Sequence, residues 1–259
     1  MAAVTPVNLG LCGQCRVITS LADCGFVDGQ NDQADIKMKL LHTRILFLLL
    51  AVAASLTVWA DGRWTLEKQD DELGIQVFTR EVDGSDLKAF RGTMTLTSTL
   101  TAPVALIEDT RRAPEWMYNC KVVEIIEFLN PGEALSYMVT EAPWPVSDRD
   151  TIVHSLASQD KDSKVVRIDV HARTDVFPEN DEYVRITQMQ GFWSFAPAAR
   201  AGMIDVIYEV HAEPNGGLPS WLANSVVVET PYHTLKNMQR LLQESQYQQA
   251  ELAFIDNVD

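Results

Sequence analysis

The sequence has few basic residues: 21 Lys and Arg stand against 36 Asp and Glu, which gives a formal net charge of −15. Nucleic acid is therefore not an expected partner, because binding its phosphates takes a basic patch. An anionic membrane would also repel the average charge, although a local basic patch still allows docking. The acidity itself indicates solubility and does not indicate a fold.

Cysteine is scarce, and only Cys120 lies beyond residue 37. Cys12 and Cys15 have the spacing of a redox or zinc pair, but no second pair or histidine cluster follows, so we expect neither site. We expect Cys120 to be a small buried side chain rather than a nucleophile. A Gly-x-Ser-x-Gly elbow, a phosphate loop and a dinucleotide fingerprint are also absent. We therefore expect no catalytic residues, no metal and no cofactor.

A long hydrophobic run is missing as well. Residues 45–60 carry no charge, but a spanning helix needs about 20 apolar residues. Basic residues precede this stretch and Ala60 ends it, which is typical of a cleaved signal peptide. We expect residues 38–60 to be that peptide, with Met38 as the true start and residues 1–37 as a disordered extension. An N-terminal membrane anchor is the alternative, and both place the rest of the chain outside the cytosol, in a bacterial periplasm.

Hydrophobic periodicity beyond residue 61 predicts a single α+β domain over residues 61–259, with no repeat or linker. A short helix is expected first, at residues 64–73. Two short helices are expected within residues 102–116. Strands are predicted at residues 75–81, 87–100, 122–128, 135–141, 148–158, 165–172, 183–196 and 202–212. The later strands form a meander, which favours an antiparallel sheet. Residues 218–249 predict one long amphipathic helix that packs on the sheet and kinks or restarts at Pro231.

Two motifs carry a resemblance to a known family. Residues 143–150, PWPVSDRD, and residues 218–224, LPSWLAN, occur in order with this strand pattern between them. The chain resembles the steroidogenic-acute-regulatory-related lipid-transfer (START) family over residues 64–242, as an exported bacterial member. The resemblance implies the helix-grip fold, a curved antiparallel sheet wrapped around the long C-terminal helix. It also implies a tunnel for one lipid, since family members bind sterols, phospholipids or other hydrophobic molecules and carry them between membranes. The best-known members are cytosolic, and the signal peptide departs from that pattern.

Strand alternation places Arg149, Thr151 and Val153 on one face. In the family the arginine that matches Arg149 tends to point into the cavity. A buried guanidinium needs a partner, either a lipid headgroup or a carboxylate such as Glu141. The complete set of candidate ligand-binding residues is Arg149, Thr151, Val153, Trp116, Tyr137, Trp193, Asn224, Val227, Val228 and Pro231. Each aromatic residue in this set also fits a plain core or wall position.

The leading hypothesis is a non-catalytic, monomeric protein that binds a lipid or sterol-like molecule and touches membranes transiently. An enzyme of the wider helix-grip superfamily, a cyclase or hydrolase, is the alternative. It would need a general acid or base in the tunnel, with Glu141, Tyr137 and His154 as candidates. A structural or sensory module that binds a partner protein is a third hypothesis, and an exposed apolar patch would indicate it.

Overall fold

The computed structural model describes residues 62–178, 181–216 and 220–257. The elements described all belong to one unit, Ala60–Asp259. The expected signal peptide, its possible role as an anchor, the residues ahead of it and the Cys12–Cys15 pair lie outside the described residues.

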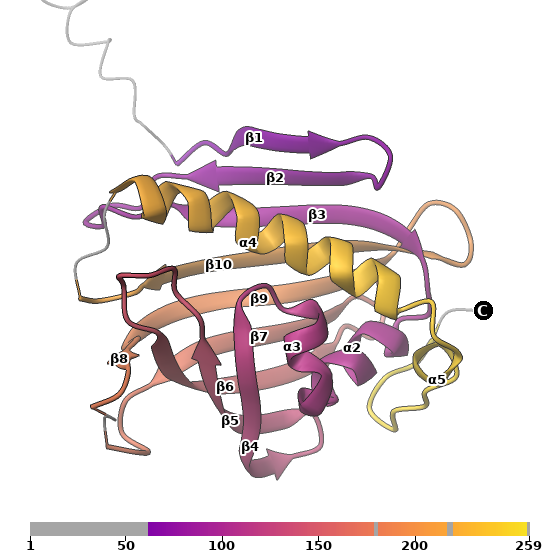
Figure 1. The fold of residues 1–259 in the computed structure, drawn as a ribbon. Helices are drawn as coiled ribbons and strands as arrows, with labels where there is room; N and C mark the ends of the chain where they lie inside the picture. Colours follow the sequence, from indigo (N-terminus) through magenta and orange to yellow (C-terminus); the bar gives the residue numbers. More distant parts are fainter. Residues whose placement is uncertain (1–61, 179–180, 217–219, 258–259) are drawn as a thin grey trace, which may run out of the picture. The chain divides into compact units, whose positions relative to one another are not determined.

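A ten-stranded sheet forms most of the molecule (Figure 1). Its main path has the order β1-β2-β3-β10-β9-β7-β6-β5-β4, and every pairing along this path is antiparallel. The short strand β8 (Val184–Arg185) pairs with β6 in parallel. The path consists of β1 (Thr65–Asp70), β2 (Ile75–Arg80), β3 (Ala89–Thr97), β4 (Cys120–Asn130), β5 (Glu133–Thr140), β6 (Arg149–Gln159), β7 (Val166–Arg173), β9 (Gln188–Pro197) and β10 (Met203–Glu213). The predicted antiparallel α+β sheet is confirmed.

The helices lie on one side of this sheet (Figure 1). They are α2 (Thr101–Glu108), η1 (Thr110–Arg112), α3 (Ala113–Trp116), α4 (Ser220–Leu241) and α5 (Ser245–Gln248). The long helix α4 crosses β2 and β3, whereas α2 and α3 lie in front of the strands at the other half of the sheet. Both halves of the sheet therefore gain a helical cover, but from different parts of the chain.

The helix α4 packs very closely on β3 at Gly92. A Cβ atom at this position would lie 2.7 Å from Leu235 Cδ1 and 3.0 Å from Pro231 Cβ. Leu235, Met238 and Leu242 are fully buried on the same side of the helix, at the three- and four-residue steps that the sequence predicted. This end of the interior is filled by the protein's own side chains.

Several local expectations differ from the structure. The single strand expected at residues 183–196 is divided into β8 and β9, because β8 pairs with β6 in parallel before the chain enters β9. The helix expected at residues 64–73 is absent from the structure. Thr65–Asp70 form the strand β1 and residues 71–74 form a turn, because pairing with β2 overrides weak helix propensity.

Of the two outcomes expected at Pro231, a kink or a restart, the restart does not occur, since α4 continues through Pro231 to Leu241. The expected element is divided later, where Glu244 precedes α5.

Candidate ligand-binding cavity

The space between the sheet and the helices holds two cavities. The first, which we call the helix chamber, has a volume of about 140 Å³ and is bounded by α2, α3 and the strands β4 to β7. The second, the loop chamber, has a volume of about 190 Å³ and is bounded by α4 and the loops at residues 87–88, 118–119 and 141–143. Five residues line both chambers, so the two meet there. We call these residues the waist: Met117, Met138, Met189, Tyr208 and Val210.

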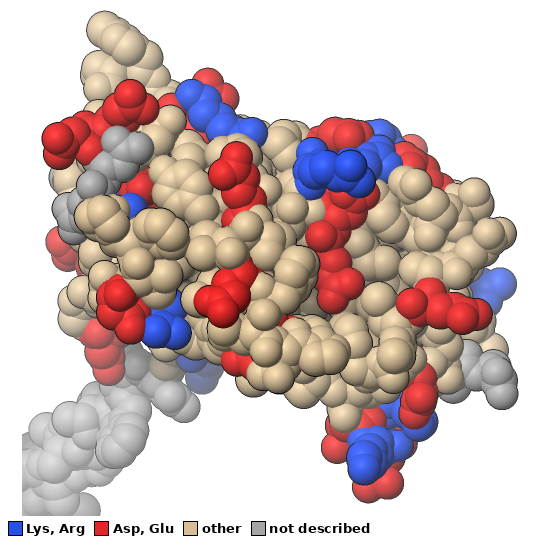
Figure 2. Space-filling view, turned by 90° about the horizontal axis from the view of Figure 1, so that it is seen from below, with Lys and Arg blue, Asp and Glu red and all other residues tan. Residues whose placement is uncertain are grey.

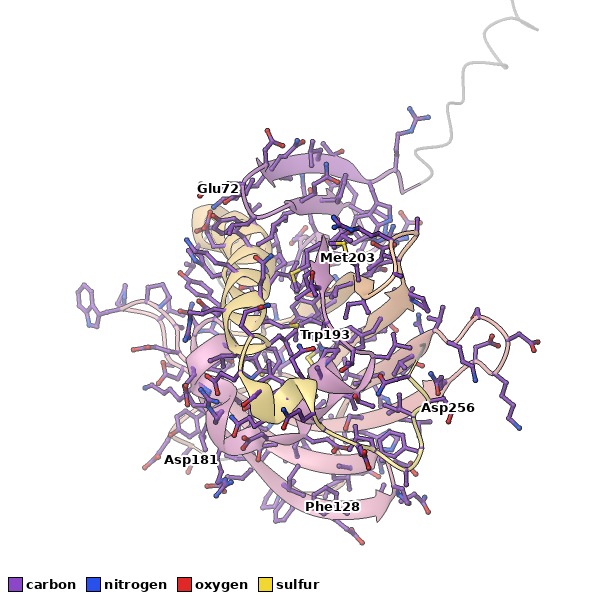
Figure 3. All side chains as sticks on the ribbon, turned by 90° about the vertical axis from the view of Figure 1, so that its right-hand side faces the viewer. Glu72, Phe128, Asp181, Trp193, Met203 and Asp256 are labelled. Carbon is purple, nitrogen blue, oxygen red and sulfur yellow. The ribbon has the colours of Figure 1, made fainter. Side chains whose placement is uncertain are left out.

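Aromatic rings form the inner wall of the helix chamber. Trp193 of β9 stacks on Tyr208 with ring centroids 3.8 Å apart and an interplanar angle of 5°. It also meets the edge of Trp116 at 5.9 Å. Figure 3 places Trp193 in the middle of the molecule, between the sheet and the helices. Trp116 is 2% exposed, and its Nε1–H has no hydrogen-bond partner within the described residues.

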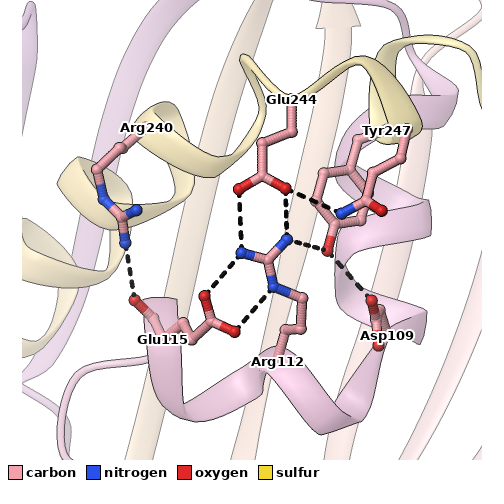
Figure 4. A network of polar contacts seen from close by, with 7 residues as sticks. Asp109, Arg112, Glu115, Arg240, Glu244 and Tyr247 are labelled. Atoms are coloured by element: carbon pink, nitrogen blue, oxygen red, sulfur yellow. Dashed lines mark hydrogen bonds and ion pairs between the residues drawn. The ribbon is translucent and has the colours of Figure 1, made fainter.

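A polar network holds the helical wall of this chamber in place (Figure 4). The Arg112 guanidinium, which lies at the junction of η1 and α3, donates to Glu115 at 2.8 and 2.7 Å and to Glu244 at 2.5 and 3.0 Å. It also donates to the hydroxyl of Tyr247, which in turn donates to Asp109. These bonds connect the segment that carries Trp116 to the C-terminal end of the chain.

Arg149 is the buried cation of the loop chamber. It is 5% exposed, and its guanidinium donates to three backbone carbonyls, those of Ser147, Pro214 (3.4 Å) and Asn215 (3.3 Å). Burial is the main cause that lowers the pKa of Arg149. Of the two partners considered for Arg149, a carboxylate is not found, since no carboxylate of the described residues lies within 4 Å of the guanidinium. Glu141 lines the same chamber but is exposed and does not contact the guanidinium.

Asp148, the residue that precedes Arg149, binds other groups. Asp148 accepts from Lys121 Nζ at 2.5 Å and from the Ala142 backbone N–H at 2.9 Å, and these bonds lower the pKa of Asp148. The charge of Asp148 opposes the effect of burial on Arg149 only in part. The loop at residues 141–148 is thus fastened by Asp148, while Arg149 has no ion-pair partner in the part of the chain that the structure describes.

The structure brings five of the predicted site residues to the cavity. Arg149 and Val227 line the loop chamber, and Trp116, Val153 and Trp193 line the helix chamber. The remaining five do not line either chamber or are not described. Thr151 is buried and donates to the Ile186 carbonyl at 3.3 Å.

Tyr137 lies on the opposite face of the sheet, where its hydroxyl donates to Asp150 at 3.2 Å. The even-numbered residues of β5, among them Ser136 and Met138, face the cavity. Strand alternation therefore turns Tyr137 away from it.

The helix α4 presents a different stripe from the expected one. Leu222, Val226, Val227, Thr230 and Thr234 line the loop chamber. Val228 and Pro231 belong instead to the tightly packed side of α4 against the sheet. The side chain of Asn224 lies outside the described residues. The four-residue step from 222 to 234 was visible in the sequence, but only packing decides which stripe of a helix faces a cavity.

Sequence reasoning also missed a buried ion pair behind the cavity. Arg185 of β8 donates to both oxygens of Asp150, at 2.9 and 2.8 Å, and the two side chains are 4% and 0% exposed. Arg185 also donates to the carbonyls of Phe177 and Pro178. The pair ties the loop before β8 to β6.

His154, the histidine candidate for acid–base chemistry, lies outside the chambers. His154 Nε2 is 2.8 Å from Glu133, and the ring of His154 meets the ring of His171 edge-on at 4.7 Å. Burial and the nearby His154 lower the pKa of His171. No group of three or more possible metal ligands occurs in the part of the chain that the structure describes. Of the three candidate acids or bases, only Glu141 lines a chamber.

Two large apolar side chains stand exposed at the openings. Trp144, in the loop whose Ala142 and Pro143 line the loop chamber, is 91% exposed. Phe128 is 69% exposed, lines the helix chamber and stands at the edge of the molecule (Figure 3). Acidic side chains are spread over the face seen in Figure 2, with basic side chains in small groups beside them. Among the described residues, no helix is both long and apolar enough to cross a membrane.

A curved antiparallel sheet, closed by a C-terminal helix over an apolar cavity, defines a protein of the helix-grip class. The chain belongs to the START domain family, whose model matches residues 49–248. It is 33% identical over 177 residues to an uncharacterized protein of Pseudomonas aeruginosa, covering 68% of this chain and 84% of that protein.

Similar solved structures include two lipid transfer proteins. A STAR-related lipid transfer protein fragment from Xanthomonas axonopodis has a TM-score of 0.64 and 36% identity, over 71% of this chain and all of that one. Human StAR-related lipid transfer protein 5 has a TM-score of 0.60 over 80% of this chain and 97% of that one. Its 15% identity shows a shared fold alone.

Proposed function

We propose that the protein is a non-catalytic carrier that holds one lipid or other hydrophobic molecule in the two chambers and exchanges it at membranes. The observation that supports this most directly is an apolar interior cavity that the protein's own side chains leave unfilled. Membership of the START family and the name of the similar Xanthomonas protein support the same function. We propose that the protein does this outside the cytosol, on the basis of the signal-like stretch at residues 38–60, and that it acts as a monomer.

The driving force is the transfer of apolar ligand surface out of water, which gains about 25 cal/mol per Å². Each chamber is of the order of the roughly 150 Å³ apolar cavity that holds a benzene molecule. A ligand that occupies both chambers therefore buries considerably more apolar surface than a single ring does. Its polar end belongs in the loop chamber, because Arg149 is there.

The loop at residues 141–148 is the proposed membrane contact. Trp144 extends into solvent next to the loop chamber, and tryptophan prefers the interface between water and lipid. Insertion of this ring would bring the chamber opening to the acyl region. Trp144→Ala is expected to weaken binding of residues 61–259 to vesicles. Leu66→Ala removes another exposed apolar side chain, on β1, and is expected to leave binding unchanged. If both variants bind vesicles as well as the wild type does, the loop at residues 141–148 is not the membrane contact.

Native mass spectrometry of purified residues 61–259 tests the carrier function. We expect a bound hydrophobic molecule, and uptake of a fluorescent lipid after delipidation. Val153→Trp adds bulk to the helix chamber and should reduce uptake. Leu156→Trp is a matched control on the same strand, because Leu156 is 43% exposed and does not line a chamber. A protein that purifies empty and takes up no lipid is not a carrier. Lipid movement between donor and acceptor vesicles then separates transfer from sensing.

A further inference from the structure

Among the described residues two arginine guanidinium groups are buried, those of Arg149 and Arg185, and they differ in their hydrogen-bond partners. Arg185 is neutralised by Asp150 through two hydrogen bonds. Arg149 is equally buried, yet it has only carbonyl partners within residues 62–178, 181–216 and 220–257. Carbonyls satisfy N–H groups but do not neutralise charge, and a buried unpaired charge is costly. The position of Arg149 is thus electrostatically incomplete, and Arg149 is the one of the two that lines a chamber.

The unused hydrogen-bond donors of Arg149 also indicate an anionic ligand. A guanidinium carries five N–H donors in a planar fork. Three of the donors of Arg149 are used by the carbonyls of Ser147, Pro214 and Asn215, which leaves one on each terminal nitrogen. Two remaining donors suit a carboxylate or phosphate group, which binds arginine through paired, charge-assisted hydrogen bonds. Lys88 and Glu141 line the same chamber, and Lys88 is paired with Glu81 at 3.2 Å, so the case for an anion rests on Arg149.

The shape of the cavity limits what can be attached to such a head group. A ligand that reaches from Arg149 into the helix chamber must pass the waist, where Met117, Met138 and Met189 meet the ring of Tyr208. Tyr208 is fixed by its stacking on Trp193, whereas methionine side chains are flexible and adapt to a chain between them. An unbranched chain fits between these side chains more easily than a rigid fused-ring skeleton.

We infer that the ligand is a single-chain amphiphile with an oxyanion head, bound by Arg149 in the loop chamber, and with its chain passing the waist into the helix chamber. The inference rests on the proposed function and narrows its substrate class. The oxyanion is a carboxylate, as in a fatty acid, or a phosphate monoester, as in a single-chain phospholipid. Both groups offer the paired oxygens that the free donors require.

Binding of three ligands with one chain length tests the head group. Dodecanoate, dodecyl phosphate and dodecanol are titrated into delipidated residues 61–259 at pH 8 by isothermal calorimetry. At least one anion is expected to bind about tenfold or more tightly than the alcohol, the effect of a charge-assisted hydrogen bond. The stronger of the two anions identifies the head-group class. Arg149→Gln should remove this preference and leave the alcohol affinity near its wild-type value. Arg200→Gln is the control of equal charge change, because Arg200 is exposed and lines neither chamber.

The wild-type comparison decides the matter even if Arg149→Gln does not fold. Equal affinity for dodecanol and both anions overturns the inference but leaves the carrier function intact. If none of the three ligands binds, the inference about the ligand is also overturned. The proposed carrier function is overturned only if the protein takes up no fluorescent lipid either. The path of the chain has a separate readout, the indole ¹⁵N signals of Trp116 and Trp193, which line only the helix chamber. Dodecanoate should shift both signals and hexanoate neither. Unmoved signals with dodecanoate would show that the chain stays out of the helix chamber.

Discussion

Removing one partner of the Asp150–Arg185 pair should destabilise the protein strongly. In Arg185→Ala the carboxylate of Asp150, which is 0% exposed, loses both guanidinium hydrogen bonds, and among the described residues it keeps the 3.2 Å bond from the Tyr137 hydroxyl. Leaving a buried charge uncompensated in this way costs about 3–5 kcal/mol. The loop before β8 also loses the bonds from Arg185 to the carbonyls of Phe177 and Pro178. We therefore expect a loss near the upper end of that range.

Urea unfolding of residues 61–259, followed by tryptophan fluorescence, measures this loss as a lower midpoint at an unchanged slope. Asp169→Ala is the control, because Asp169 pairs with Arg167 on the surface, where the side chains are 51% and 44% exposed. Such pairs contribute about 0–1 kcal/mol. The double variant Asp150→Leu/Arg185→Met should regain much of the loss, since it leaves no buried charge. If Arg185→Ala lowers the free energy of unfolding by less than about 1 kcal/mol, Asp150 does not depend on Arg185 for its neutralisation, and the reasoning is refuted.

Three further predictions follow from single positions. Gly191→Ala should lower stability by about 1–3 kcal/mol, because the new Cβ would lie 2.3 Å from the Glu209 carbonyl oxygen; an unchanged melting temperature would contradict the close approach of β9 and β10. Asp148 has a lowered pKa in the fold because of its bonds to Lys121 and Ala142, so the folded state binds fewer protons than the unfolded state near pH 4 and stability is lost as the pH falls below about 4. Asp148→Asn should flatten that acid limb in urea unfolding at several pH values, and an unaltered slope would exclude the contribution. Burial raises the pKa of the Cys120 thiol to about 11, so iodoacetamide at pH 8 should label it slowly in the native protein and rapidly in urea; equally fast labelling in both would show that the thiol is exposed.

Local patterns in the sequence determined the framework of this protein. Alternation over β5, β6 and β10 predicted strands, and the steps through Leu235, Met238 and Leu242 predicted the buried side of α4. The segments PWPVSDRD and LPSWLAN were enough to identify the START family. These features are accessible because periodicity and short motifs depend on neighbours a few residues apart.

The tertiary structure decided everything that depends on groups far apart in the chain. β1 is a strand because β2 pairs with it. Within the described residues Arg149 forms no ion pair, whereas Asp150 pairs with Arg185, 35 residues away, and Asp148 pairs with Lys121. The waist unites methionines from three separate segments with Tyr208, and it divides the cavity into two chambers. A sequence specifies which side chains are available, but distances across the fold determine which of them remain unpaired at a cavity, and those are the groups left to bind a ligand.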